Sequence, residues 1–352
     1  MRLLLLLLIA LGASAQTNRT VTVRPSGGNY TSLSAALTGE AGDLVALNRQ
    51  LTIELYAMED TAAATIASAS WTTDATRYIL ITVPTAERHA GVYTTSKYRL
   101  TNSGAAPLSI ANSVFVVVDG LQVYTTANNH SPVNFITGSG AAANQTIRNC
   151  IIRGNTNVSS KGLINGGGTS NSSRNIYIYN NLIYDSYRVT GSGRGIQIDV
   201  VGNWYVWNNT LPLVGQGLLR NNGVVIAVNN LISATSATAS GTFAAGTNYN
   251  ATTLSTMGYT VTGGGNANDR TSQTFTFAGA GTGDYHLAGT DTGAKDFGMT
   301  NPGAGVFSHD IDGEPRNGAW DIGADEYPSA GRRRNIVIAQ RMKIAATGGQ
   351  TD

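Results

Sequence analysis

The charged and aromatic side chains best suited to chemistry gather in one stretch of the chain. The charged candidates are Asp185, Arg188, Arg194 and Asp199, and the aromatic candidates are Tyr184 and Tyr187. Two carboxylates could act as general acid and general base on a glycosidic bond, or an arginine could neutralise a substrate carboxylate while a neighbour removes a proton. The tyrosine rings could stack on sugar rings. The alternative is a solvated loop whose charges pair locally.

A second acidic stretch, Asp-Ile-Asp-Gly-Glu at residues 310–314, is similar to a calcium-binding loop. An EF-hand needs a bidentate glutamate at its twelfth position, but the twelfth residue from Asp310 is Asp321, and the glycine comes too early. The spacing favours a structural turn in which Arg316 bridges the acidic side chains. Calcium stays an open alternative, and we assign no metal ligand and no cofactor.

The composition limits the kinds of protein that could position these residues. Charged residues make up 12% and hydrophobic residues 41% of the 352-residue chain, which has 42 glycines and 31 asparagines. So little charge and so much Gly and Asn exclude a helical bundle or coiled coil. The 23 basic and 21 acidic residues give a net charge of +2, too even a balance for electrostatic capture of nucleic acid. We expect a β protein with a polar surface.

The first residues have the pattern of an export signal. Arg2 precedes an apolar run at residues 3–11, and Ala-Ser-Ala at 13–15 suits a signal peptidase. We expect cleavage near Ala15 and a secreted or cell-surface protein. The run is too short to span a membrane, which takes about 20 residues, so no membrane span is expected. Cys150 is the only cysteine, which excludes an intrachain disulfide.

A unit of strand, corner and strand repeats through the middle of the chain. We place its corners at Asp119, Asn149, Asn180, Asn208 and Asn229. Their spacings of 30, 31, 28 and 21 residues are typical of a solenoid with loop insertions. Asparagine tolerates the left-handed backbone of a sharp bend, and stacked corner amides could form a hydrogen-bonded ladder between coils about 4.8 Å apart.

Apolar residues beside these corners are expected to point inward and stack. We predict that Ile151, Leu182, Leu211 and Leu231 form one buried column, with Cys150 as a buried thiol in register with Leu182 and Leu231.

The N-terminal part predicts one short helix near residues 30–37 and several strands. Leu33, Ala36 and Leu37 have helical spacing, and Thr31 or Ser32 could cap the helix. Strands are expected at Val21–Val23, Leu44–Leu47, Leu51–Leu55, Tyr78–Val83, Tyr98–Thr101 and Val114–Val118.

The two ends of this pattern resemble known proteins. The N-terminal strand, Gly-rich turn and helix, followed by Gly-Asp-Leu-Val at 42–45, resemble the cap of pectin-lyase-like proteins. The motifs at 284–287 (Asp-Tyr-His-Leu), 296–298 (Asp-Phe-Gly), 310–316 and 321–326 (Asp-Ile-Gly-Ala-Asp-Glu) resemble the end of exported proteins called choice-of-anchor Q. The resemblance implies an all-β, single-stranded right-handed parallel β-helix with a short N-terminal capping helix. The chain departs from it after Tyr327, where the basic residues Arg332 to Arg334 and a strand-like run at 336–338 follow, so we expect no hydrophobic anchor there.

The catalytic elements of related enzymes are missing. The chain lacks the Asn-Thr-Asp, Asp-Asp and Gly-His-Gly elements of galacturonan hydrolases of this architecture. The repeats also lack a dense carboxylate cluster of the kind that pectate lyases use to hold calcium.

These observations divide the chain into four segments and leave three functions open. The segments are a signal peptide at 1–15, the capped β-helix at 16–240, irregular coils and closing motifs at 241–328, and a basic tail at 329–352. We expect a non-catalytic exported protein that binds a polysaccharide or a surface partner. The alternatives are a divergent polysaccharide lyase or glycosidase, and a phage fibre or virion-surface protein.

Overall fold

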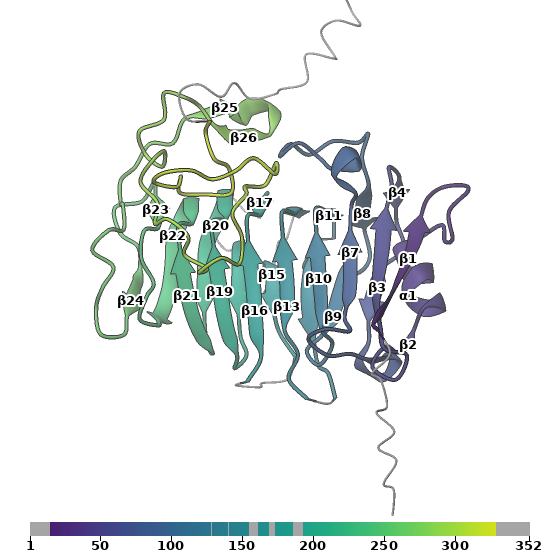
Figure 1. Cartoon of the computed structure of the whole chain (residues 1–352). Helices are drawn as coiled ribbons and strands as arrows, with labels where there is room; N and C mark the ends of the chain where they lie inside the picture. Colours follow the sequence, from purple (N-terminus) through teal and green to yellow (C-terminus); the bar gives the residue numbers. More distant parts are fainter. Residues whose placement is uncertain are drawn as a thin grey trace, which may run out of the picture.

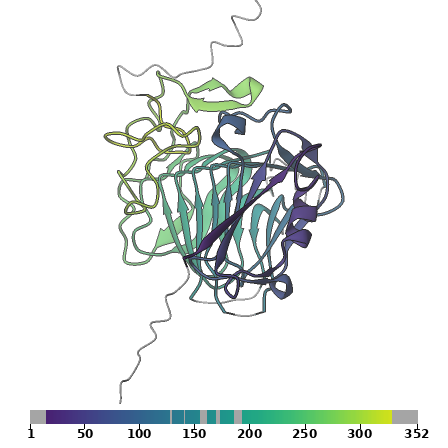
Figure 2. The ribbon, with the colours of Figure 1, turned by 45° about the vertical axis from the view of Figure 1, so that its right-hand side comes forward.

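The computed structural model describes residues 15–127, 129–139, 141–154, 161–168, 173–185 and 193–328. The predicted signal segment, except for its last residue, and the predicted basic tail lie outside these ranges. The described chain winds into successive coils whose strands stack in parallel along one axis (Figures 1 and 2). This confirms the predicted all-β, right-handed parallel β-helix. In the described ranges no helix is long and apolar enough to cross a membrane.

Each coil has up to three faces. The first face contains β1 (Thr17–Val23), β3 (Arg49–Leu55), β7 (Ile79–Thr82), β10 (Val116–Asp119), β13 (Gln145–Arg148), β16 (Asn175–Tyr179), β19 (Asn203–Trp207) and β21 (Val224–Val228). The second contains β4 (Glu59–Asp60), β8 (Arg99–Asn102), β11 (Gln122–Thr125), β14 (Ile151–Gly154), β17 (Leu182–Tyr184) and β23 (Ala251–Thr252). The third contains β5 (Ala64–Ile66), β9 (Leu108–Ala111), β12 (Val133–Ile136), β15 (Gly162–Gly166), β18 (Arg194–Ile198) and β24 (Tyr259–Val261). The long strands β20 (Thr210–Arg220) and β22 (Leu231–Phe243) run from the second face into the third.

The remaining elements are short. Two small sheets pair β2 (Gly42–Asp43) with β6 (Trp71–Thr72), and β25 (Phe277–Gly279) with β26 (Asp284–Leu287). Three 3-10 turns are η1 (Ser68–Ser70), η2 (Thr85–Glu87) and η3 (Ala280–Thr282).

The predicted helix forms as α1 (Leu33–Gly39) at the N-terminal end of the coils (Figure 1). The Ser32 side chain accepts a hydrogen bond from the Ala35 amide, so the predicted cap is confirmed. Leu33, Ala36 and Leu37 are buried in the main core, as their helical spacing predicts.

One of the predicted strands is wrong. Residues 44–47 form a turn that begins after β2. The Asp43 carboxylate accepts a hydrogen bond from the Ala46 amide at 2.8 Å, and Asn48 has a left-handed backbone with φ of 45°. Apolar residues therefore occur here in a turn that Asp43 stabilises.

The predicted corners are equivalent positions of successive coils, with one correction. Asn149, Asn180, Asn208 and Asn229, the corner asparagines, all have left-handed backbones, with φ between 49° and 57°. They follow the paired residues Arg148, Tyr179, Trp207 and Val228. Asp119 pairs with Arg148, so the first corner is Gly120 and Asp119 is the last residue of its strand. Glycine satisfies the same left-handed requirement, with φ of 79°.

Of the predicted ladder between corner amides, one rung is present, from Asn229 to Asn208 at 3.2 Å, and the continuous ladder lies one residue further along the chain. The inner asparagines are Asn181, Asn209, Asn230 and Asn250. Each of the first three donates its side-chain amide to the amide oxygen of the next at 2.9 to 3.0 Å. Each also donates to a backbone carbonyl inside the coil, and the ladder residues are fully buried. The corner side chains point outward because the left-handed residue turns the chain, and the next residue then faces the interior. Cys150 pairs in register with Asn181, not with Leu182 and Leu231, and its buried thiol has a raised pKa of about 12 because of burial.

The predicted apolar column is buried but lies on the outside of the coils. In strand register Ile151 is followed by Leu182, Thr210, Leu231 and Ala251, so Leu211 belongs to the interior. The outer column is buried because residues 284–327, here called the closing segment, cover it. In Figure 1 this segment runs in green and yellow beside the coils of β17, β20 and β22.

Candidate functional site

A second outward column on the second face brings an arginine between two tyrosines. Tyr124 of β11 pairs in register with Arg153 of β14, which pairs with Tyr184 of β17. Each of the three lies four residues after a corner. Strand spacing therefore sets them about 4.8 Å apart along the solenoid.

The Arg153 guanidinium is held by one carboxylate and lies over three aromatic rings. Its Nε and Nη2 atoms donate to Oδ2 of Asp185 at 3.0 and 2.5 Å. Its Cζ atom is 4.5 Å from the ring centroid of Tyr93, 5.1 Å from that of Tyr124 and 4.9 Å from that of Tyr184. We call these five residues the tyrosine–arginine patch.

Elements on either side complete the patch. Tyr93 comes from the loop before β8 and meets Tyr124 edge to face, with centroids 6.0 Å apart. Tyr285 of β26 packs against Tyr184 with centroids 5.2 Å apart. Figure 1 shows the loop before β8 and the β25–β26 hairpin rising beyond the coils at this end of the second face.

The patch is partly open to solvent and balanced in charge. The side chains of Arg153 and Asp185 are 26% and 34% exposed, and Tyr93 and Tyr124 are half-buried, whereas Tyr184 is buried. Burial raises the pKa of the Tyr93 and Tyr184 phenols, so they stay protonated. The site therefore offers hydroxyl groups, aromatic surface and one ion pair.

This arrangement suits binding better than acid–base chemistry. Among the described residues, Asp185 is the one carboxylate that forms an ion pair with Arg153. General acid–base cleavage of a glycosidic bond needs two carboxyl groups facing each other across the bond. Aromatic rings beside a charge-balanced polar pair instead match the apolar faces and hydroxyls of a sugar.

Three of the charged residues that we predicted as catalytic lie in the described ranges, and they are divided between two faces of the solenoid. Asp185 lies at the end of β17 on the second face, whereas Arg194 and Asp199 belong to β18 and the turn after it, on the third. Gln197 links these two, since it accepts from Arg194 at 2.8 Å and donates to Asp199 at 2.6 Å. Of the predicted binding residues, Tyr184 lies in the patch. Arg188 and Tyr187 lie outside the described residues.

Sequence reasoning missed Tyr93, Tyr124 and Arg153. Counting four residues from the corners at Gly120, Asn149 and Asn180 places Tyr124, Arg153 and Tyr184 in one column, and this signal was readable. Assigning the first corner to Asp119 shifts the count by one and hides Tyr124. Tyr93 comes from a loop without periodicity, so no pattern places it.

Corner asparagines also hold the closing segment. Each donates its side-chain amide to backbone carbonyls: Asn180 to His309 (2.6 Å), Asn208 to Asp321 and Gly323 (3.2 Å each) and Asn229 to Met299 (2.8 Å). The closing segment therefore meets the repeat at its corners.

The acidic stretch at 310–314 is a turn, as predicted, but Arg316 pairs with Glu326 and not with the acidic side chains of the turn. Asp310 Oδ1 accepts from the amides of Asp312 and Glu314 at 3.0 and 2.8 Å. Arg316, which is fully buried, forms an ion pair with Glu326 at 3.2 Å and donates to Asn180 at 3.0 Å. This arginine therefore joins the closing segment to the solenoid.

No protein-family model matches the chain, and no curated protein matches it.

Proposed function

We propose that this protein is an exported β-solenoid that binds a polysaccharide at the tyrosine–arginine patch without cleaving it. The observation that carries the proposal is the placement of Arg153 among Tyr93, Tyr124 and Tyr184, with Asp185 as its partner. Aromatic surface and hydrogen-bonding groups that several elements hold in place are what an extended sugar chain requires.

The charge balance favours a neutral polysaccharide. Asp185 already occupies Nε and Nη2 of Arg153, so a uronate carboxylate would compete with a bonded carboxylate. The hydroxyls of a neutral sugar can bond to the same ion pair without displacing it. Tyr93 and Tyr124, the more open rings, would contact the sugar, and Tyr184 would support Arg153 from behind.

Export and the absence of turnover rest on the sequence. The signal pattern before Ala15 and the similarity of the closing motifs to choice-of-anchor Q proteins support export. Two observations support binding without cleavage. The galacturonan-hydrolase elements are missing from the sequence, and Asp185 is the one carboxylate paired with Arg153 among the described residues.

Calorimetry with purified mature protein tests the proposal. The probes are soluble neutral polysaccharides, such as xylan and galactomannan, with polygalacturonate as the charged comparison. Tyr124→Ala is expected to weaken binding of a neutral polysaccharide about tenfold, which corresponds to about 1.4 kcal/mol. Tyr205→Ala is the matched control, because this tyrosine lies on the first face with its ring stacked on Tyr177 at 5.0 Å.

Two results would contradict the proposal. Equal loss in Tyr124→Ala and Tyr205→Ala, or no binding to any polysaccharide, would remove the patch as the site. Release of reducing ends, or absorbance from unsaturated products, that disappears in Asp185→Asn would establish the enzyme alternative instead.

A further inference from the structure

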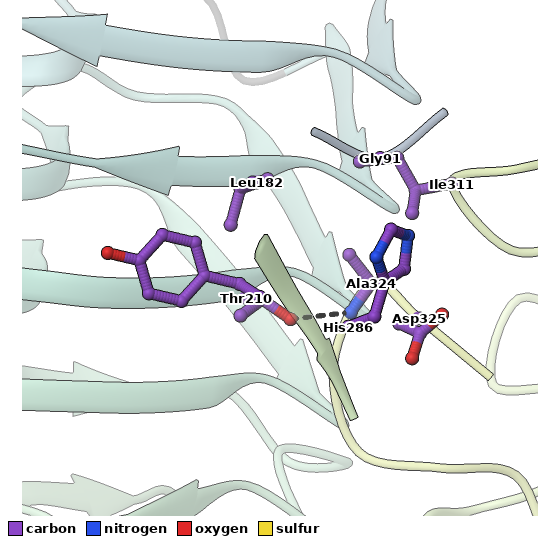
Figure 3. A pocket seen from close by; sticks show the side chains of 8 residues that line it. Gly91, Leu182, Thr210, His286, Ile311, Ala324 and Asp325 are labelled. Carbon is purple, nitrogen blue, oxygen red and sulfur yellow. Dashed lines mark hydrogen bonds between the residues drawn. The ribbon is translucent and has the colours of Figure 1, made fainter. Parts of the chain in front are cut away.

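Three metal-ligating side chains meet where the closing segment touches the loop before β8. His286 of β26, Asp312 and Asp325 each offer one ligand atom, and these atoms lie within 4.8 Å of one another. His286 and Asp325 are buried. Figure 3 shows His286, Asp325 and Gly91 around a cavity that Tyr285 and Ile311 also line.

The imidazole of His286 is oriented as it is in many metal sites. Its Nδ1 atom lies 2.5 Å from Oδ1 of Asp284, and its Nε2 atom lies 2.7 Å from Oδ2 of Asp312. In a metal-ligating histidine, a carboxylate commonly accepts from one ring nitrogen and leaves the other to bind the metal. Asp284 is placed for that supporting role.

An orphaned oxygen points independently to a cation. Oδ1 of Asp312 is buried and has no hydrogen-bond partner, which is costly for a carboxylate. The backbone at Gly91 closes over the same atoms, since a Cβ there would lie 2.2 Å from Nε2 of His286 and 2.6 Å from Oδ1 of Asp312. With φ of 64°, Gly91 is also left-handed, so the loop approaches this closely only with glycine.

We propose that His286, Asp312 and Asp325 bind a divalent transition metal, Zn²⁺, that clamps the closing segment. One imidazole nitrogen and two carboxylates form a ligand set for zinc, whereas calcium and magnesium prefer oxygen ligands alone. A metal about 2.0–2.2 Å from each ligand atom would give the orphaned Asp312 oxygen a partner. The metal would join β26 to the two motifs at 310–316 and 321–326. This clamp is separate from the tyrosine–arginine patch and does not depend on polysaccharide binding.

Metal titration of the full mature protein, stripped with chelator, tests the site. We expect one Zn²⁺ per chain, a visible absorption spectrum of low-coordinate Co²⁺ when cobalt replaces zinc, and a higher melting temperature with zinc than with calcium or magnesium. His286→Gln and Asp312→Asn should each weaken zinc binding more than about 100-fold, and Asp284→Asn, which removes only the supporting contact, about 10- to 100-fold. His309→Gln is the control, because His309 is exposed and should leave binding unchanged.

Circular dichroism of each metal-free variant separates loss of the site from loss of the fold. Asp312→Asn alters a side chain that is 21% exposed, so it should fold even where His286→Gln does not. A protonated imidazole that bridges Asp284 and Asp312 is the competing explanation of the same hydrogen bonds. The proposal is overturned if the folded wild-type protein binds no zinc at micromolar concentrations, or if Asp312→Asn binds zinc as the wild-type protein does.

Discussion

The corner asparagines and the inner asparagines follow one another directly in the chain, yet their contacts differ in kind. Inner side chains bond to one another and to carbonyls inside the coils. The corner side chains of Asn180, Asn208 and Asn229 donate to the closing segment, and one bond joins two corners, from Asn229 to Asn208 at 3.2 Å. The left-handed corner residue reverses which way its neighbour faces, so one asparagine supports the coil and the other holds its cover.

The comparison predicts two kinds of mutational damage. Loss of an inner asparagine leaves buried polar groups unpaired on both neighbouring coils, and water cannot replace its bonds. Loss of a corner contact frees backbone carbonyls that water can reach once the closing segment moves. The first kind should unfold the solenoid, and the second should loosen only its cover.

The largest effect is expected for Asn209→Ala. Asn209 accepts from the backbone and side chain of Asn181 and donates to Asn230 and the carbonyl of Ile178. Removing these bonds should lower the free energy of unfolding by about 3–5 kcal/mol, measured by urea denaturation. Asn222→Ala, at an exposed turn, is the control and should change stability by less than about 0.5 kcal/mol. A loss below about 1 kcal/mol for Asn209→Ala would show that the ladder is not essential.

Leu182→Ala should cost about 3 kcal/mol, and its damage should be local. Leu182 belongs to the outer column and packs with Ile151, Ile311 and Ala324 under the closing segment. The cavity left behind accounts for the cost. Hydrogen exchange should increase at residues 311–324 and stay unchanged at β16 and β19. Uniformly faster exchange across the first face would place Leu182 in the interior instead.

Sequence reasoning reached the coil architecture but not the contacts on its outside. The repeat of strands and asparagines predicts the fold, because left-handed corners and parallel stacking produce a periodic pattern in the sequence. The Ser32 cap could also be predicted, because it depends only on neighbouring residues. The side on which Ile151 and Leu182 are buried depends on the closing segment, more than 100 residues away, which has no period. For the same reason the meeting of Tyr93 with Arg153 and of His286 with Asp325 could not be read from spacing.

Acid should weaken the contact between the loop before β8 and the Asn149 corner through His89. This buried imidazole lies 2.9 Å from the Asn149 carbonyl, and its other nitrogen accepts from the Gly91 amide at 3.3 Å. Burial lowers the pKa of His89 from 6.5 to about 4. Between pH 6.5 and pH 4 the unfolded chain therefore binds a proton at His89 that the folded chain does not bind. The free energy of unfolding is highest above pH 6.5 and decreases as the pH falls toward 4, by up to about 3 kcal/mol.

The matched variant for this pH dependence is His89→Gln, which can keep a donor and an acceptor without titrating. The difference in unfolding free energy between wild type and variant, measured at each pH from 8 to 4, removes the contributions of other groups. We expect the wild-type protein to lose its advantage between pH 6.5 and 4. A difference that is constant across this range would show that His89 is not held neutral by burial.

The smallest effect is expected for Asn208→Gly, which tests the comparison most directly. Glycine accepts the left-handed backbone of this corner, where φ is 49°, so the variant removes the side chain without adding strain. What is lost is three hydrogen bonds of 3.2 Å: two that Asn208 donates to the carbonyls of Asp321 and Gly323, and one that it accepts from the Asn229 side chain. Because water can bond to these carbonyls when the closing segment moves away, we expect the free energy of unfolding to fall by about 1 kcal/mol.

Hydrogen exchange should increase at residues 321–324, while the amides of the neighbouring inner asparagines Asn209 and Asn230 stay protected. If Asn208→Gly instead destabilised the coils as much as Asn209→Ala, the corner and inner asparagines would form one network. The conclusion that inner asparagines stabilise the coils and corner asparagines hold the closing segment would then be wrong.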